Sequence, residues 1–253
     1  MKKKNYETGN AKNVANFQTL GIAVKSYGIV YKPSNPRIAL LALQSAYSDA
    51  NAGQIAIENM LKLHRDSILY RHNLYKPVKV LATRVLRAVK TSDVDDGVIA
   101  QTKALVYKIR GERMKPLPKK GTGVVPPETT PEPPVPVNSH SVSQQSFSNI
   151  IDHYNGLIIV LTGEPNYAPN ETDLTVVSLT TLTSGMKTSN DDCDTALFDY
   201  NNAATVRNKL LYAPKTGLYD LAQTTKNYVS QLFGLKSPEY KAILKIKFSK
   251  NSA

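Results

Sequence analysis

The tripeptides Tyr31-Lys32-Pro33 and Tyr75-Lys76-Pro77 share the pattern tyrosine, any residue, proline, and we call each such tripeptide a corner. The pattern returns later in the chain as Tyr167-Ala168-Pro169 and Tyr212-Ala213-Pro214. The tyrosines lie 44 residues apart in the first pair and 45 apart in the second, and each pair is separated by a proline-poor run with apolar residues at helical spacing. Because proline ends or begins a helix, the spacing predicts one helical unit written twice.

The predicted fold is all-α, with two tandem up-down bundles of about four helices each. We expect a basic N-terminal bundle at residues 1–114, a proline-rich linker at residues 115–141 and a near-neutral C-terminal bundle at residues 142–253. Eight of the fifteen prolines lie between Pro116 and Pro136, so the linker is expected to be an extended polyproline II spacer. A ligand for proline-reading domains is the alternative for this segment.

The corners also predict where helices begin. Asn35 and Pro36 suit the N-cap and the first helical position. A turn is expected at residues 49–54, around Gly53, and the alternative is one unbroken helix to Tyr75, about 60 Å long at 1.5 Å per residue. A polar stretch at residues 184–192 has the corresponding position in the second copy.

The corner residues are expected to have a structural role. The proline breaks the helix, and the tyrosine ring packs on the end of the bundle with its hydroxyl in water. A binding role for Tyr31 and Tyr167 is the alternative. The full set of predicted corner residues is Tyr31, Pro33, Tyr75, Pro77, Tyr167, Pro169, Tyr212 and Pro214.

The net charge of +12 is unevenly distributed along the chain. Residues 1–120 carry 22 Lys/Arg and 8 Asp/Glu, a net +14, whereas residues 121–253 carry 10 Lys/Arg and 12 Asp/Glu, a net −2. Such a field attracts polyanions, although a solubilising surface or docking on acidic neighbours explains it equally simply. The candidate polyanion-binding residues are Lys76, Lys79, Arg84, Arg87 and Lys90.

The sequence offers little that points to catalysis or to a metal. None of the four histidines, at positions 64, 72, 140 and 153, is four residues from another, as a helical metal site requires. The single Cys193 excludes an intramolecular disulfide; we expect it to pack as a small apolar residue beside a turn and helix start at residues 190–194. We therefore expect no enzyme, catalytic residue, metal or cofactor.

Two stretches resemble a known family. Residues 5–17, from Asn5 to Phe17, and residues 233–240, from Phe233 to Tyr240, resemble a family of functionally uncharacterised two-repeat helical proteins from Bacteroidetes-type bacteria. The resemblance implies a bacterial origin and a helical fold, and it brings no activity or site residues. The polar residues after Met1 and the short apolar runs predict no signal peptide or membrane span, so a cytoplasmic location is expected.

The sequence favours a non-enzymatic interaction or structural protein that acts in a self-assembly or a larger complex. Its expected partners are copies of itself or other protein subunits. The alternative is a nucleic-acid- or ribosome-associated protein that binds through the basic N-terminal bundle.

Overall fold

A computed structural model describes residues 9–112 and 145–250 of the chain. All regular elements within these two ranges are α-helices or short 3-10 helices, which confirms the prediction of an all-α fold. The predicted proline-rich linker at residues 115–141 lies outside the described ranges.

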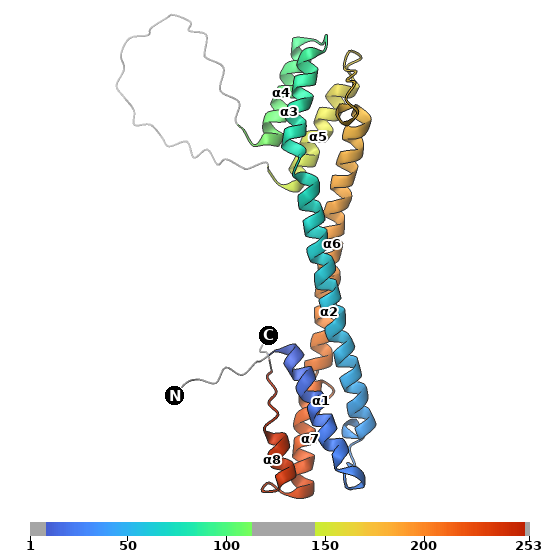
Figure 1. Cartoon of the computed structure of the whole chain (residues 1–253), viewed down its shortest axis with the longest axis vertical. Helices are drawn as coiled ribbons and strands as arrows, with labels where there is room; N and C mark the ends of the chain where they lie inside the picture. The colour runs from blue at the N-terminus through green and yellow to red at the C-terminus, as the bar shows by residue number, and fades with distance from the viewer. Residues whose placement is uncertain (1–8, 113–144, 251–253) are drawn as a thin grey trace, which may run out of the picture. The chain divides into compact units, whose positions relative to one another are not determined.

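The helices follow one another in two series of similar order (Figure 1). The first series is α1 (Asn10–Ser26), η1 (Gly28–Val30), η2 (Pro36–Ile38), α2 (Leu40–Tyr75), α3 (Val78–Thr91) and α4 (Asp96–Arg110). The second is α5 (Phe147–Thr162), η3 (Thr172–Leu174), α6 (Val176–Tyr212), α7 (Leu218–Phe233) and α8 (Pro238–Leu244). Asn35 caps η2 by accepting a hydrogen bond from the Arg37 N–H, and Pro36 is its first residue, as predicted.

The turn predicted at residues 49–54 is wrong, because α2 runs unbroken from Leu40 to Tyr75. Gly53 serves close helix packing: a Cβ at this position would lie 2.9 Å from Cδ1 of Leu210 on α6. The polar stretch at residues 184–192, including the helix start predicted at residues 190–194, likewise lies inside α6. The Ser189 hydroxyl donates a 2.8 Å hydrogen bond to the Met186 carbonyl in the preceding helical turn, so its polarity does not break the helix.

The described helices pack into two compact units, which we treat separately. Unit 1 comprises residues 1–67 and 194–253, and unit 2 comprises residues 68–193. These units do not coincide with the predicted bundles at 1–114 and 142–253. The physical reason is the length of α2 and α6, each of which contributes residues to both units.

Unit 1 is built around α1, α7 and α8, drawn in blue and red in Figure 1, with the adjoining parts of α2 and α6. Helix α7 packs against α1, α8 and η2. The core residues are Val14, Phe17, Leu20, Val24, Tyr31, Ile38, Leu43, Ala50, Leu211, Leu218, Leu221, Ala222, Val229 and Ile243.

Unit 2 is built around α3, α4 and α5 with the remaining parts of α2 and α6. Helix α4 packs against both α3 and α5, and η3 packs against α3. Tyr154 is fully buried here, and its hydroxyl donates a 2.6 Å hydrogen bond to the Val78 carbonyl. The remaining core is made mainly of aliphatic residues of α3, α5, η3 and α6: Val78, Ala82, Val85, Val89, Ile150, Leu157, Leu161, Leu174, Leu179 and Met186.

Candidate functional sites

The residues at 31–38, the first corner, and at 167–174, the second corner, are held by the same hydrogen bond. The Tyr31 hydroxyl donates to the Ile38 carbonyl, and the Tyr167 hydroxyl donates to the Leu174 carbonyl, each at 2.7 Å. Both tyrosines are buried, and burial raises the pKa of each to about 12. The prediction that these hydroxyls lie in water is therefore wrong: each one satisfies a carbonyl just before a long helix begins.

The other two corner tyrosines also have protein partners. The Tyr75 hydroxyl donates to the Phe147 carbonyl at 3.2 Å and accepts from the Asn190 side chain at 3.1 Å. The Tyr212 hydroxyl shares a 2.6 Å hydrogen bond with the side-chain amide of Asn10. These contacts favour the structural interpretation of the corner tyrosines over a binding role.

The four corner prolines all lie between helices. Pro33 and Pro169 are half-buried and precede η2 and η3 respectively. Pro77 is exposed at the N-cap position of α3. Pro214 is exposed in the turn that precedes α7.

The five predicted polyanion-binding residues are brought together on α3 and at its N-terminal end. All five are exposed, while the opposite face of α3 is buried in unit 2. Arg84, however, forms a bidentate ion pair with Asp173 of η3, and Lys79 Nζ donates to the Arg110 carbonyl at 3.4 Å. The Asp173 carboxylate balances one of the five positive charges, so this surface of α3 carries less net positive charge than the sequence indicates.

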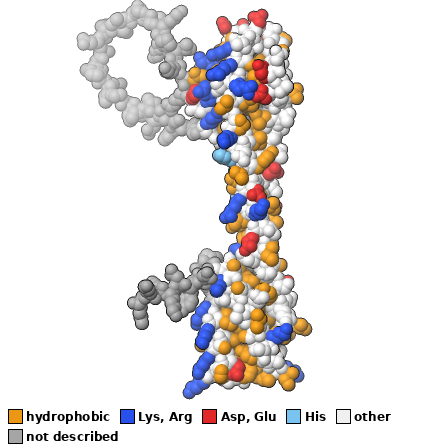
Figure 2. Space-filling model, viewed as in Figure 1, with side chains coloured by type: hydrophobic (Ala, Val, Ile, Leu, Met, Phe, Trp, Pro, Cys, Tyr) orange, Lys and Arg blue, Asp and Glu red, His pale blue; other side chains and the backbone are white. Residues whose placement is uncertain are grey.

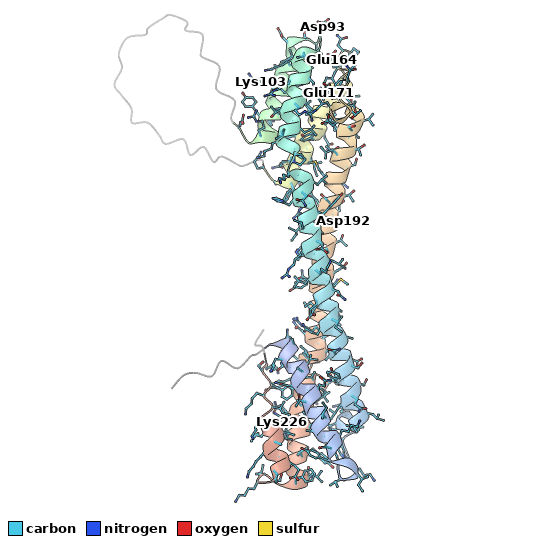
Figure 3. All side chains as sticks on the ribbon, in the orientation of Figure 1. Asp93, Lys103, Glu164, Glu171, Asp192 and Lys226 are labelled. Atoms are coloured by element: carbon cyan, nitrogen blue, oxygen red, sulfur yellow. The ribbon has the colours of Figure 1, made fainter. Side chains whose placement is uncertain are left out.

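A pocket of about 550 Å³ lies between α3 and the second corner in unit 2. Its polar lining includes Arg84, Arg87, Ser92, Asn170 and Glu171, and Figure 3 labels Glu171 at this corner. The pocket carries charges of both signs, which suits a small polar ligand better than a polyanion. Sequence reasoning identified the two arginines but missed Asn170 and Glu171, although both directly follow the second Tyr-x-Pro pattern.

Described residues of unit 1 also line pockets. One, of about 280 Å³, is lined by residues of the first corner and of α7, among them Asn35, Arg37, Asp220 and Asn227. The other, of about 570 Å³, lies between α2 and the end of α6 and is lined mainly by small residues such as Ala42, Ala46 and Ala213. The smaller pocket combines the first corner with α7, as the pocket of unit 2 combines the second corner with α3.

The reactive side chains are isolated from one another. Cys193 is buried, as expected of a small apolar residue. Burial and the nearby Lys108 lower the pKa of His153. Residues 9–112 and 145–250 contain no group of three or more histidine, cysteine or acidic residues that could hold a metal ion, and none of their helices is both long and apolar enough to span a membrane.

Two buried polar residues of unit 1 went unnoticed in the sequence. Asn13 of α1 and Lys226 of α7 are 2% and 7% exposed, and both contact the residues that follow α8. Figure 3 labels Lys226 on α7. The alternation of apolar and basic residues at Ile246, Lys247 and Phe248 is the sequence signal that could have indicated this contact.

Large apolar side chains are exposed beside both corners. Leu41, three residues after Ile38, is 79% exposed, and Val177, three residues after Leu174, is 76% exposed. Ile29, shortly before the first corner, is 97% exposed. Leu41 and Val177 thus occupy the same position relative to their corners, and both are exposed.

The net charge is distributed differently over the two units than over the two sequence halves. Unit 1 contains 18 Lys/Arg and 8 Asp/Glu, a net +10, and unit 2 contains 14 and 12, a net +2. Figure 2 shows Lys and Arg side chains on both units, mixed with acidic ones over α3 and α4. Most of the excess positive charge therefore belongs to unit 1, which includes both ends of the sequence.

Comparisons with protein-family models, with curated proteins and with solved structures find no match for this chain. The resemblance to a bacterial two-repeat family stays a prediction.

Proposed function

We propose that this chain is a non-enzymatic interaction protein that associates with further copies of itself through its two corners. The observation that carries the proposal is the matched exposure of Leu41 and Val177, each the second residue of a long helix that starts at a corner. Burying one such side chain contributes about 1.5–3 kcal/mol, and because this contribution is apolar, salt screens it little.

The corners are suited to this role because they are rigid. The hydrogen bonds of Tyr31 and Tyr167 fix each corner against the first turn of the following helix. A preorganised surface loses little conformational entropy on binding. The surface of the partner copy that contacts each corner is therefore expected to be apolar, without a charged group that the corner would have to pair.

The test replaces Leu41 and Val177 together by serine and measures the dissociation constant of self-association by sedimentation. We expect the dissociation constant to rise by about ten-fold or more for each side chain that is no longer buried in the interface. The matched control replaces Val206 and Val80, exposed apolar residues elsewhere on α6 and α3, by serine. Equal effects of the two double variants would contradict a specific role of the corners.

We further propose that the chain contains two copies of one helical unit, joined by the proline-rich segment as a spacer. The recurring order of helix, 3-10 helix, long helix and short helix supports this. So does the tyrosine-to-carbonyl bond, which spans seven residues in both copies. Exchanging the corner segments 31–38 and 167–174 between the copies should leave the helix content of the chain unchanged. Replacing either segment by an unrelated sequence of the same length should lower the helix content.

Binding of nucleic acid through basic residues is the second candidate, and the exposure of all five basic residues on and before α3 favours it. The Arg84–Asp173 ion pair speaks against it. A steep fall of RNA or DNA affinity with salt, made shallower by Arg87→Gln, is the expected result for this candidate.

A further inference from the structure

Helix α8 ends at Leu244. Residues 245–250, which we call the tail segment, are not helical and pack against unit 1 (Figure 1). Their exposure alternates at first: Ile246 and Phe248 are half-buried, whereas Lys245 and Lys247 are exposed. Alternation of this kind is typical of an extended chain with one face against a surface.

Side chains of α1 and α7 hold the backbone of the tail segment. Asn13 accepts a hydrogen bond from the Ser249 N–H at 3.1 Å and donates one to the Ser249 carbonyl at 2.7 Å. Asn16, one helical turn later on α1, donates to the Lys247 carbonyl at 2.6 Å. Lys226 of α7 donates to the Ile246 carbonyl. We call Asn13, Asn16, Phe17 and Lys226 the tail groove.

The tail groove binds the backbone of the tail segment, as a neighbouring β-strand binds the backbone of an added strand. Hydrogen bonds to N–H and carbonyl groups require an extended backbone but no particular side chain. Sequence preference comes from one aromatic position: the Phe248 ring packs edge-on against Phe17, with 6.5 Å between ring centroids, and lies 5.0 Å from Lys226 Nζ. The site therefore selects an extended peptide with an aromatic residue.

The occupant is also replaceable. The groove holds the segment through its backbone and through one aromatic ring, so a chemically identical segment can take its place. When the tail segment leaves, water can reach the amides of Asn13 and Asn16 and the ammonium group of Lys226, which then keep hydrogen-bond partners. Vacating the groove thus leaves these polar groups hydrated rather than unsatisfied.

We propose that the tail groove is a peptide-binding site that takes the tail segment of a second copy of this chain in place of its own. A second copy presents the same segment and forms the same contacts, which makes exchange of an identical element an inexpensive route to association. The covalently attached segment competes at an effective concentration on the order of millimolar, so exchange is rare until one copy's own segment is weakened. Asn13 also donates to the Tyr212 hydroxyl at 3.1 Å, but no residue of the tail groove lies in the first or the second corner, so this inference stands independently of the proposed function.

The test mixes two full-length variants that carry different dyes at their N-termini. Phe248→Ala weakens the tail segment and leaves the groove intact, while Asn13→Ala weakens the groove and leaves the segment intact. We expect energy transfer in this mixture several-fold above that of a wild-type pair at the same concentration. Association through the corners contributes equally to both mixtures, so its failure and the failure of this inference are distinguishable.

A synthetic peptide of residues 245–253 provides the second readout. It should displace the energy-transfer signal, and it should bind the Phe248→Ala chain at least about ten-fold more tightly than wild type. The same peptide with Ser249→Pro lacks the N–H that Asn13 accepts and is the matched control.

A mixture signal equal to that of the wild-type pair, with helix content retained in both variants, would overturn the proposal. If Phe248→Ala does not fold, Ser249→Pro in the chain replaces it, since it weakens the same attachment without opening the packing around Phe17.

Discussion

Replacing Tyr31 and Tyr167 by phenylalanine removes one buried hydrogen bond from each corner and leaves the ring packing in place. The lost donor leaves a carbonyl at the entrance of a long helix without this partner, that of Ile38 or of Leu174. A buried hydrogen bond of this kind contributes about 1 kcal/mol, and an acceptor left unpaired costs about 1–3 kcal/mol. We therefore expect each substitution to lower the free energy of unfolding by about 1–2 kcal/mol, and because the two corners share no partner, the losses should add.

The two hydroxyls also predict a dependence on alkaline pH. Burial raises the pKa of both tyrosines from 10.0 to about 12 in the folded chain. Their contribution to stability is complete below pH 10, the pKa of the unfolded state, and it is lost as the pH rises through 12. The double phenylalanine variant should lack this part of the alkaline loss.

Urea denaturation followed by circular dichroism, at neutral pH and at about pH 11, measures both effects. Tyr70→Phe is the matched control, because Tyr70 is 59% exposed and should tolerate the change. If the corner variants unfold at the same urea concentration as the Tyr70 variant, the reasoning about the corners is refuted.

Three further predictions concern single groups. The lowered pKa of His153 means that the unfolded chain takes up this proton first, so stability should fall as the pH drops below 6.5, and His153→Asn should reduce that loss in acid titrations followed by circular dichroism. Arg84→Gln should lower the melting temperature only slightly, since an exposed ion pair such as Arg84–Asp173 contributes under about 1 kcal/mol; a large drop would contradict the exposure of the pair. Cys193 is 2% exposed, so its thiol should react with a thiol reagent at the rate at which the chain opens, and fast labelling of the native protein would contradict its burial.

The fold class could be predicted from the sequence because it depends on local information. Apolar residues at helical spacing indicated helices between the corners, and Asn35 with Pro36 located the entrance to η2. Whether the chain turns at Gly53 could not be predicted from local sequence. Glycine at a turn and glycine at a close helix contact look identical until Leu210, more than 150 residues away, is known to lie against it.

The candidate sites were only partly predictable for the same reason. The sequence identified Arg84 and Arg87 by their charge, but the ion pair to Asp173 joins residues 89 positions apart. The contact of Asn13 with Ser249 joins residues 236 positions apart. The hydroxyl of Tyr31 was expected in water because the sequence alone does not show that the Ile38 carbonyl lies next to it in the folded corner.

The measurement that tests the central proposal most directly is size-exclusion chromatography with light scattering on nuclease-treated protein, at low and at high salt. We expect a mass above the 27.8 kDa of one chain that is unchanged by salt, because apolar contacts at the corners are not screened. A mass of 27.8 kDa at both salt concentrations, or co-elution with added nucleic acid at low salt only, would contradict it.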